Sequence, residues 1–301
     1  MGGIQTGTLV IGKAGQLATA LKEALIKDEA TKDKIAKDKT APARQNAPNH
    51  SMAKADEAAD FIFRGRLDHD FFDQTATQRL IERHNIGTLI NTAAYTGVDQ
   101  AEAEPEAADR LNRDLPKTLA TVCREMGCRL IHISTDYVFD GQQAKGQAYA
   151  PHDTPNPINV YGKSKLAGED AICGIDQVQA KIIRTSWLHS AFGKNFQTTM
   201  QRLMRERAEL RVVNDQWGTP THANDLARHL IHLSQSPTWT PKHIHHFRSQ
   251  PTMTWYDLAC QIKQNMTKND HPLAKIIPIP TTEYPTPAKR GKNTSLSPWQ
   301  N

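Results

Sequence analysis

The stretch TLVIGKAGQLA, which runs from Thr8 to Ala18, decides the fold of this 301-residue chain. An apolar run that ends on Gly12 predicts a short strand, and residues 16–27 carry apolar side chains at helical spacing. A strand that turns on glycine into a helix is the opening unit of a sheet with helical crossovers. The first residues therefore predict a β–turn–α unit.

The alternation of strand and helix continues through the first half of the chain. Because helices of this length connect parallel strands, the sequence predicts an α/β fold with a Rossmann-type, doubly wound parallel sheet. Ligands of such sheets bind at the carboxyl ends of the strands. Apolar runs place the further strands at 61–63, 88–91, 129–134 and 181–185, and helical periodicity places helices at 75–84, 105–126 and 159–172.

The second half is less regular and predicts a smaller C-terminal lobe. We assign residues 1–185 mainly to the sheet domain and residues 186–301 mainly to the lobe, with the two partly interwoven. In the second half we expect helices near 195–207, 223–233 and 254–266, short strands at 211–213 and 243–247, and mostly extended loop over 272–298.

Residues 28–58 interrupt this pattern, since Lys, Asp, Ala, Pro and Asn dominate and large apolar side chains are almost absent. Such a composition predicts a flexible or loosely helical surface insertion. The insertion also explains the mean hydropathy of −0.61, which is low for an α/β protein.

The composition excludes several function classes. A net charge of +5 without basic runs does not indicate a nucleic-acid-binding protein, and no apolar stretch approaches the length of about 20 residues that spans a bilayer. The N-terminus lacks a secretory signal pattern. The four cysteines form no CxxC pair and predict reduced thiols without a structural zinc site. We expect a cytoplasmic protein that binds neither nucleic acid nor a membrane.

The turn after the first strand predicts a dinucleotide site, which makes residues 1–185 an NAD(P)-binding domain. Gly12 and Gly15, in the pattern GxxGxxA, allow a pyrophosphate to approach the start of the helix at Gln16 and Leu17. At the end of the second strand stands Arg64, where an arginine favours the 2′-phosphate of NADP. The sequence therefore favours NADPH, with NADH as the alternative.

The best catalytic candidates are Tyr161 and Lys165, in the spacing YxxxK on a predicted helix. Residues four apart share a helix face, so we expect the Lys165 ammonium to lower the pKa of the Tyr161 phenol and make it a usable general acid. Thr135 directly follows a predicted strand, at the sheet edge where ligands bind, and its hydroxyl can hydrogen-bond a substrate carbonyl.

Eight blocks of sequence resemble the dTDP-4-dehydrorhamnose reductase family of extended short-chain dehydrogenase/reductases, and they occur in the family's order. The resemblance covers nearly the whole chain except about 28–58. The blocks are GKAGQLA at 12–18, NTAAYTGVDQAE at 91–102, STDYVFDG at 134–141, NVYGKSK at 159–165, RTSWL at 184–188, VVNDQWGTPTHANDLA at 212–227, HIHHFRSQPTMTWYDLA at 243–259 and KRGKNTSL at 289–296.

The resemblance implies reduction by NADPH of the C4 keto group of dTDP-4-dehydro-L-rhamnose, giving dTDP-L-rhamnose. It implies that Tyr161 protonates the new alkoxide, that Lys165 contacts the nicotinamide ribose, and that Thr135 positions the carbonyl. The turn formed by Ala93, Ala94 and Tyr95 would lie along the cofactor, and the substrate would contact Asp136, Trp187, Arg290 and Asn293.

Two other functions stay open on the sequence alone. The VNDQWGTPTHANDLA block is also similar to the regulatory β subunit of methionine adenosyltransferase, a noncatalytic NADP-binding protein on the same fold. A reductase of another 4-keto sugar nucleotide would share every catalytic residue. The resembled family includes homodimers joined through a Mg²⁺ ion that glutamates hold. We do not place these ligands in this sequence, so we assign no metal, and a homodimer stays the expected assembly.

Overall fold

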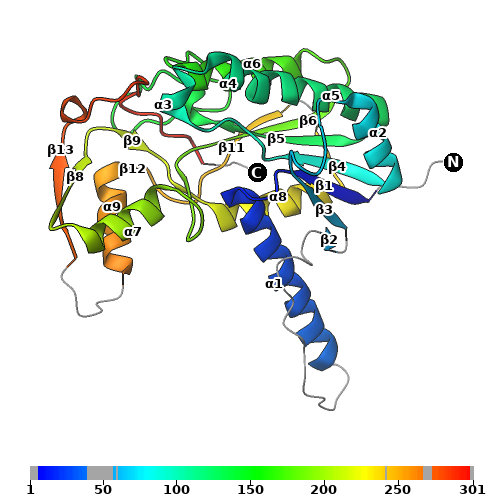
Figure 1. The fold of residues 1–301 in the computed structure, drawn as a ribbon, viewed down its shortest axis with the longest axis horizontal. Helices are drawn as coiled ribbons and strands as arrows, with labels where there is room; N and C mark the ends of the chain where they lie inside the picture. The colour runs from blue at the N-terminus through cyan, green and yellow to red at the C-terminus, as the bar shows by residue number, and fades with distance from the viewer. Residues whose placement is uncertain (1–5, 39–56, 59, 241–242, 267–272, 299–301) are drawn as a thin grey trace.

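The structure is a computed structural model that describes residues 6–38, 57–58, 60–240, 243–266 and 273–298. A twisted sheet with helices on both faces forms the larger part of the molecule, and a smaller lobe lies beside it (Figure 1). Among the described residues no helix is both long and apolar enough to cross a membrane.

The central sheet confirms the doubly wound α/β fold. Its strand order is β11-β6-β5-β4-β1-β3-β2, with every neighbouring pair parallel except β2 and β3. On one side of β1 the strands β4, β5 and β6 follow one another in chain order. The edge strand beyond β6 is β11, which comes from the second half of the chain. The strands are β1 (Gly7–Ile11), β2 (Glu57–Ala58), β3 (Phe61–Arg64), β4 (Ile86–Asn91), β5 (Arg129–Thr135), β6 (Gln179–Thr185) and β11 (His243–His246).

Apolar side chains alternate between the two faces of the sheet, as the period of two in a strand requires. Leu9 and Ile11 pack under one helix layer, whereas Val10 packs under the other. The first layer consists of α2 (Gln74–Arg83), α5 (Leu115–Met126) and α6 (Val160–Cys173), and the second of α1 (Gln16–Asp38) and α8 (Ala223–Gln235).

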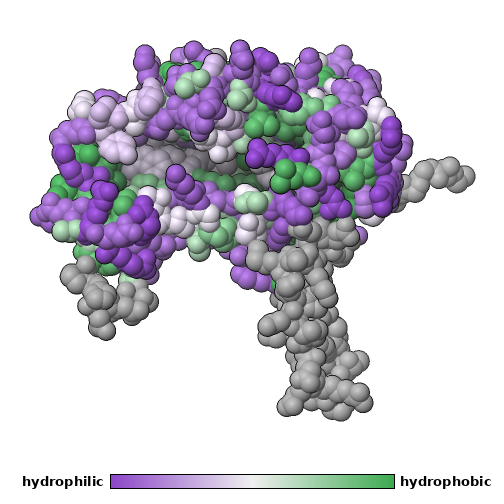
Figure 2. Space-filling view, viewed as in Figure 1, coloured by the Kyte–Doolittle hydropathy of each residue, from purple (hydrophilic) through white to green (hydrophobic). Residues whose placement is uncertain are grey.

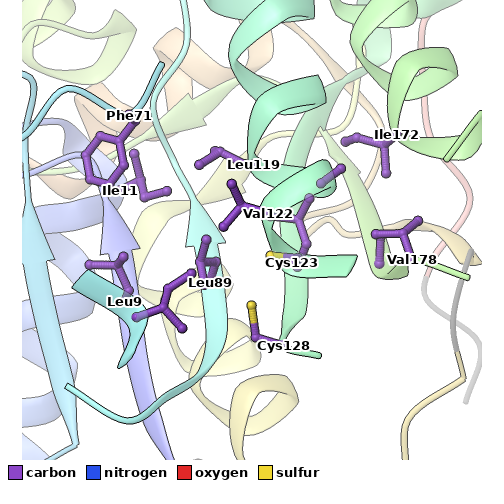
Figure 3. Packing of buried hydrophobic residues seen from close by; sticks show 14 of the residues in the cluster. Leu9, Ile11, Phe71, Leu89, Leu119, Val122, Cys123, Cys128, Ile172 and Val178 are labelled. Carbon is purple, nitrogen blue, oxygen red and sulfur yellow. The ribbon is translucent and has the colours of Figure 1, made fainter. Parts of the chain in front are cut away.

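Figure 3 shows the first of these cores, in which Leu89 and Leu119 lie close to Cys123 and Cys128. No disulfide joins the four cysteines, all of which lie in the described part of the chain, and their reduced state stays a prediction. Burial raises the pKa of the Cys123 thiol well above its usual value, so this sulfur is an apolar core atom rather than a nucleophile.

The predicted helix 105–126 contains a π-helical turn. The short helices α3 (Val98–Ala101) and α4 (Pro105–Asp109) precede this turn, Arg110–Asp114, which runs on into α5. The insertion of one residue per turn redirects the side chains on either side of it, and such turns are frequent at functional sites. Here it carries Asn112, which is fully buried.

The lobe has its own core, to which α7 (Phe196–Glu206) and α9 (Trp255–Asn265) contribute Met204, Leu258 and Ile262. Two parallel strands, β8 (Glu209–Val213) and β13 (Lys275–Ile279), complete it. The expectation of mostly extended loop over 272–298 was therefore wrong for β13. The remaining strands form two short pairs, β7 (Leu188–His189) with β10 (Thr221–His222) and β9 (Trp217–Gly218) with β12 (Met253–Thr254).

The first helix is longer than the apolar pattern predicted, since α1 continues from Lys27 to Asp38 and projects from the body of the molecule (Figure 1). The predicted insertion thus begins as a helix. The rest of that prediction, residues 39–56, lies outside the described residues.

Candidate functional site

The turn between β1 and α1 has the geometry of a phosphate-binding turn. Gly12 has a φ of +114°, and a Cβ added there would collide with Thr92 Oγ1, so only glycine fits. Gly15 differs, because a Cβ there would meet no protein atom within 4 Å. The space in front of Gly15 is open, and it lies at the N-terminus of α1, where an anion is favoured.

Gln16 and Leu17, which follow the turn, have different contacts. Gln16 Oε1 accepts a hydrogen bond from Ser190 Oγ at 2.9 Å, which connects the turn to the lobe. Leu17 is 5% exposed and packs in the second core, so its side chain holds the helix on the sheet, and only its backbone is available at the turn.

Arg64 ends β3 beside the glycine turn, since it stands opposite Ile11 in the register of the sheet. Its Nη1 donates to Phe63 O at 3.0 Å. Lys13, which we did not single out from the sequence, lies at the same place and forms an ion pair with Asp68 at 3.6 Å. Two cationic side chains thus lie beside the glycine turn.

The turn after β4 is held by two buried asparagines. Ala93 N donates to Asn91 Oδ1 at 3.1 Å, and Tyr95 N donates to Asn112 Oδ1 at 2.9 Å. Asn112 Nδ2 also donates to Ser164 Oγ of α6 at 2.9 Å. The π-helical turn therefore ties residues 93–95, with Ala94 between them, to the helix that carries Tyr161.

Thr135 and Tyr161 lie together at the carboxyl end of β5. Thr135 Oγ1 donates to Asp136 Oδ1 at 3.1 Å and accepts from Tyr137 N at 3.2 Å. Burial raises the pKa of Tyr161 well above its usual value, and a hydrogen bond with Thr135 lowers it only in part. The Tyr137 ring packs edge-on against Tyr161, with centroids 5.6 Å apart.

Lys165 shares the helix face but its amino group points into the sheet. Its Nζ donates to Ile133 O at 2.6 Å and lies 3.2 Å from His132 Nε2. Burial lowers the pKa of Lys165 to about 8, although Glu169 raises it. The pKa of Tyr161 is thus raised in this arrangement, opposite to the direction that we expected, because burial dominates and Lys165 faces β5.

Asp136 is 1% exposed at the start of a 3₁₀ turn, Asp136–Val138, and Thr294 Oγ1 donates to its Oδ2 at 2.6 Å. Burial raises the pKa of Asp136 to about 7, and the hydrogen bonds from Thr294 and Thr135 lower it only partly. A carboxyl group next to the predicted reaction centre therefore titrates in the physiological range.

This titration predicts a pH-dependent stability. Since the pKa of Asp136 is higher in the folded chain than the unfolded value near 3.9, its contribution is fully present below about pH 4 and is lost as the pH rises through about 7. Because the folded pKa lies about three pH units above the unfolded one, protonation of Asp136 contributes at most about 4 kcal/mol to the free energy of unfolding. The wild-type protein should therefore lose up to about 4 kcal/mol more stability between pH 4 and pH 8 than Asp136→Asn, as measured by urea unfolding of both proteins. An identical pH dependence in both proteins would contradict this result.

Of the predicted substrate-side residues, Trp187 and Arg290 line a pocket between the sheet domain and the lobe, whereas Asp136 and Asn293 are not among its lining residues. The surface in Figure 2 is hollowed between the upper helices and the lobe. Trp187, which has a φ of +48°, stacks on Trp255 at 3.5 Å between ring centroids and lies against Gly218. The pocket is lined by Tyr137, Trp187, Gln216, Trp217, Trp255, Arg290, Gly291 and Thr294.

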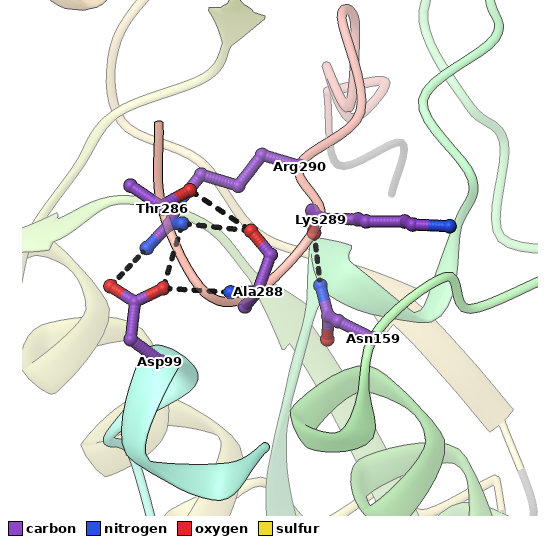
Figure 4. A network of polar contacts seen from close by, with 6 residues as sticks. All are labelled: Asp99, Asn159, Thr286, Ala288, Lys289 and Arg290. Atoms are coloured by element: carbon purple, nitrogen blue, oxygen red, sulfur yellow. Dashed lines mark hydrogen bonds and ion pairs between the residues drawn. The ribbon is translucent and has the colours of Figure 1, made fainter. Parts of the chain in front are cut away.

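Arg290 is already engaged with a carboxylate. Its Nη1 and Nη2 each donate to Asp99 of α3 at 2.9 Å, and Asp99 Oδ1 also accepts from Ala288 N (Figure 4). The Arg290 guanidinium holds the pKa of Asp99 below its usual value. This pair fastens the C-terminal segment to the sheet domain while Arg290 still lines the pocket.

Asn293 is 2% exposed, and its side-chain amide forms hydrogen bonds with backbone atoms. Its Nδ2 donates to Ala144 O at 2.8 Å and Gln147 O at 3.1 Å, and its Oδ1 accepts from Ser295 N at 3.1 Å. In this structure Asn293 shapes the loop around the pocket, and a contact of its side chain with substrate stays a prediction.

Sequence reasoning missed His132, Trp255 and Asp99 as parts of the site. His132 was visible as a polar residue in an apolar strand, RLIHIST, which is itself a signal because buried polar side chains need partners. Asp99 lies in the first turn of the short helix α3, but its partner Arg290 is far along the chain. Within the described ranges no three His, Cys, Asp or Glu side chains are grouped as a metal site.

Comparison with known proteins places this arrangement in a family. The model of the RmlD substrate binding domain matches residues 6–300. The chain is 39% identical over 234 residues to dTDP-4-dehydrorhamnose reductase of Escherichia coli (strain K12), covering 76% of this chain and 77% of that protein. It is 40% identical over 194 residues to dTDP-4-keto-6-deoxy-D-glucose reductase of Streptomyces niveus, covering 64% and 66% of the two chains.

Solved structures agree with the sequence relatives. The crystal structure of a dTDP-4-dehydrorhamnose reductase ortholog from Clostridium acetobutylicum ATCC 824 has a TM-score of 0.78 and 30% identity, over 97% of this chain and 90% of that one. The dTDP-4-dehydrorhamnose reductase of Bacillus anthracis str. Ames, crystallised with NADP, has a TM-score of 0.77 and 29% identity over the same shares. With the glycine turn, Thr135 and the Tyr161 helix at one sheet edge, the chain belongs to the RmlD substrate binding domain family.

Proposed function

We propose that this protein reduces the C4 keto group of dTDP-4-dehydro-L-rhamnose with NADPH, giving dTDP-L-rhamnose. One observation carries the proposal: Thr135 and Tyr161 lie together at the carboxyl edge of the sheet that also carries the open turn at Gly15. Relatives named dTDP-4-dehydrorhamnose reductase support the substrate class.

The residues at the sheet edge fit a dinucleotide. The open space at Gly15 leaves backbone N–H groups of the α1 N-terminus accessible to a pyrophosphate, and Arg64 and Lys13, which lie beside the turn, would supply cations to a 2′-phosphate. The residues that would hold the cofactor are Gly12, Gly15, Gln16, Leu17, Arg64, the turn 93–95 and Lys165. When bound, NADPH supplies the hydride.

The chemistry left to the chain is positioning and proton transfer. Tyr161, whose raised pKa keeps it protonated, donates its proton to the developing C4 alkoxide as a general acid. Thr135 turns its hydroxyl from Asp136 to the carbonyl oxygen, and the stacked, half-buried rings of Trp187 and Trp255 reduce the access of water to the sugar. Arg290 is placed to neutralise a diphosphate oxygen.

The test is NADPH oxidation, followed by the absorbance of the reduced nicotinamide, with a panel of dTDP-4-keto sugars. Turnover with dTDP-4-dehydrorhamnose is the expected result. Faster turnover with dTDP-4-keto-6-deoxy-D-glucose, the substrate in the name of the Streptomyces niveus relative, would favour the second reductase function. Tight NADPH binding without turnover of any sugar would favour the noncatalytic regulatory function.

Arg64 predicts the preference for NADPH over NADH. Hydrogen bonds to charged groups contribute about 1.5–3 kcal/mol, so Arg64→Ala should weaken NADPH binding roughly tenfold to hundredfold and leave NADH binding unchanged. Fluorescence titration of both cofactors measures this, with Arg79→Ala on the exposed side of α2 as the control. Equal losses for the two cofactors would contradict a 2′-phosphate contact.

Two further proposals, on the location of the protein and on its oligomeric state, rest mainly on the sequence. We propose a cytoplasmic location, which the predicted reduced state of the cysteines favours. A homodimer is likewise a proposal that rests on the family resemblance, and size-exclusion chromatography with light scattering distinguishes it from a monomer.

A further inference from the structure

A buried chain of polar contacts runs from Lys165 on α6 through β5 to β4. Lys165 Nζ lies 3.2 Å from His132 Nε2, and His132 Nδ1 lies 3.1 Å from Asn91 Nδ2. The side chains of Lys165, His132 and Asn91 are 2%, 0% and 1% exposed. Asn91 and His132 are direct neighbours in the register of the two strands. Since water does not reach them, these groups can satisfy one another only through the contacts that the structure gives.

The backbone fixes the direction of the hydrogen bonds. Because Ala93 N–H donates to Asn91 Oδ1, the other end of that amide, Nδ2, is the donor to His132 Nδ1. A neutral imidazole that accepts at Nδ1 carries its hydrogen at Nε2. Burial, the largest cause, lowers the pKa of His132 well below its usual value, so the ring is neutral whether or not Lys165 carries a charge.

The tautomer has a direct consequence for Lys165. An ammonium group has only donors, and the His132 Nε2–H is a donor that faces it at 3.2 Å. A neutral amine, in contrast, accepts from this N–H through its lone pair and still donates to Ile133 O. The position against β5 therefore fits the neutral form of Lys165 better than the charged form.

We propose that His132 is a positioning residue of the reductase, which binds the neutral amine of Lys165 against β5 and leaves the ammonium form to turn toward Tyr161. The inference rests on the proposed function, because it concerns a role of Lys165 in that reaction. After Tyr161 has given its proton to the alkoxide, an N–H bond of the ammonium breaks and the tyrosine O–H bond re-forms. The amine that remains is the form whose lone pair accepts the hydrogen bond from His132 Nε2–H.

The other ionisable groups near Lys165 have partners elsewhere, so we assign the positioning of its amine to the His132 imidazole. Glu169, on the same helix, raises the pKa of Lys165 but forms a buried ion pair with Arg184 of β6 at 2.6 Å. From the 3₁₀ turn, Asp136 and Tyr137 face Tyr161. Burial is the largest cause of the lowered pKa of Lys165. An N–H donor that faces the amine disfavours its charged form as well, on the chemistry of the two groups alone.

The first test measures the tautomer in the wild-type protein, without substrate or cofactor. Imidazole ¹⁵N chemical shifts distinguish a protonated nitrogen from an unprotonated one. We expect His132 to show hydrogen at Nε2 and a bare Nδ1 across the neutral pH range. A hydrogen at Nδ1 would overturn the proposal, whatever the variants below do.

The second test inverts the tautomer. In Asn91→Asp, one carboxylate oxygen accepts from Ala93 N–H and the other from His132 Nδ1–H, which turns Nε2 into an acceptor for the Lys165 ammonium. The titration midpoint of Lys165, followed by ¹³C NMR at Cε and assigned with Lys165→Met, should rise by about one pH unit or more.

The new charge also acts directly on Lys165, and a His132→Phe background separates the two effects. There Asn91→Asp should shift the midpoint by less than half as much, because the imidazole is gone. Equal shifts in both backgrounds would overturn the proposal. In the assay, the basic limb of kcat/KM should move with the midpoint; an inverted tautomer and a shifted lysine in a protein without reductase activity would refute only the proposed function.

Discussion

Replacement of Tyr161 by phenylalanine is expected to lower kcat for reduction of the 4-keto sugar by about 10²–10⁴-fold, which is the usual contribution of a general acid. The ring stays in its buried cluster with Tyr137, so folding and NADPH binding should change little. Only the proton that the phenol supplies to the alkoxide is lost. Steady-state kinetics, together with NADPH titration of the same variant, measures both quantities.

The matched control for this variant is Tyr284→Phe. Tyr284 is 58% exposed on the C-terminal segment, and the same loss of a hydroxyl there should leave kcat unchanged. Retention by Tyr161→Phe of more than a tenth of the wild-type kcat would remove Tyr161 from the role of proton donor.

The two glycines of the first turn are expected to respond differently to valine. Gly15→Val should keep the wild-type melting temperature, since no protein atom lies within 4 Å of the new Cβ. It should weaken NADPH binding about hundredfold or more, because the valine side chain occupies the space that the pyrophosphate needs. The charge-assisted hydrogen bond that is then lost contributes about 3 kcal/mol.

Gly12→Val is the contrasting variant. It puts a β-branched residue at a φ of +114° and drives its Cβ into Thr92, so this protein should be destabilised as well as unable to bind the cofactor. Thermal unfolding and NADPH titration of both variants test the pair. Wild-type NADPH affinity in Gly15→Val would show that the open space at the turn is not the pyrophosphate site.

The elements that form the sheet were predictable because their apolar periodicity is strong. Two elements were not, for local reasons. β13 contains Pro278, which removes a backbone donor and made the segment read as a loop, yet proline is tolerated at the edge of a two-stranded sheet. The extension of α1 beyond Lys27 consists largely of Lys, Asp, Glu and Ala, so it has helix propensity but no apolar stripe from which to predict a helix.

The candidate site was predictable in its members more than in their contacts. The spacing of Tyr161 and Lys165 places both on one helix face, but the direction of the lysine depends on His132 and on the Ile133 carbonyl of a strand more than 30 residues earlier. Likewise Arg290 was expected to contact the substrate, whereas its carboxylate partner Asp99 stands 191 positions away in the sequence. Contacts of this kind follow from the tertiary fold, which local pattern does not encode.

The most direct test of the central claim is the fate of the hydride. The purified protein would be incubated with dTDP-4-dehydrorhamnose and NADPH that carries deuterium at both C4 positions of its nicotinamide, and the sugar product would be analysed by mass spectrometry and NMR. We expect one deuterium at C4 of dTDP-L-rhamnose. A reduced sugar without deuterium at C4, or no reduced sugar from a protein that binds NADPH, would contradict it.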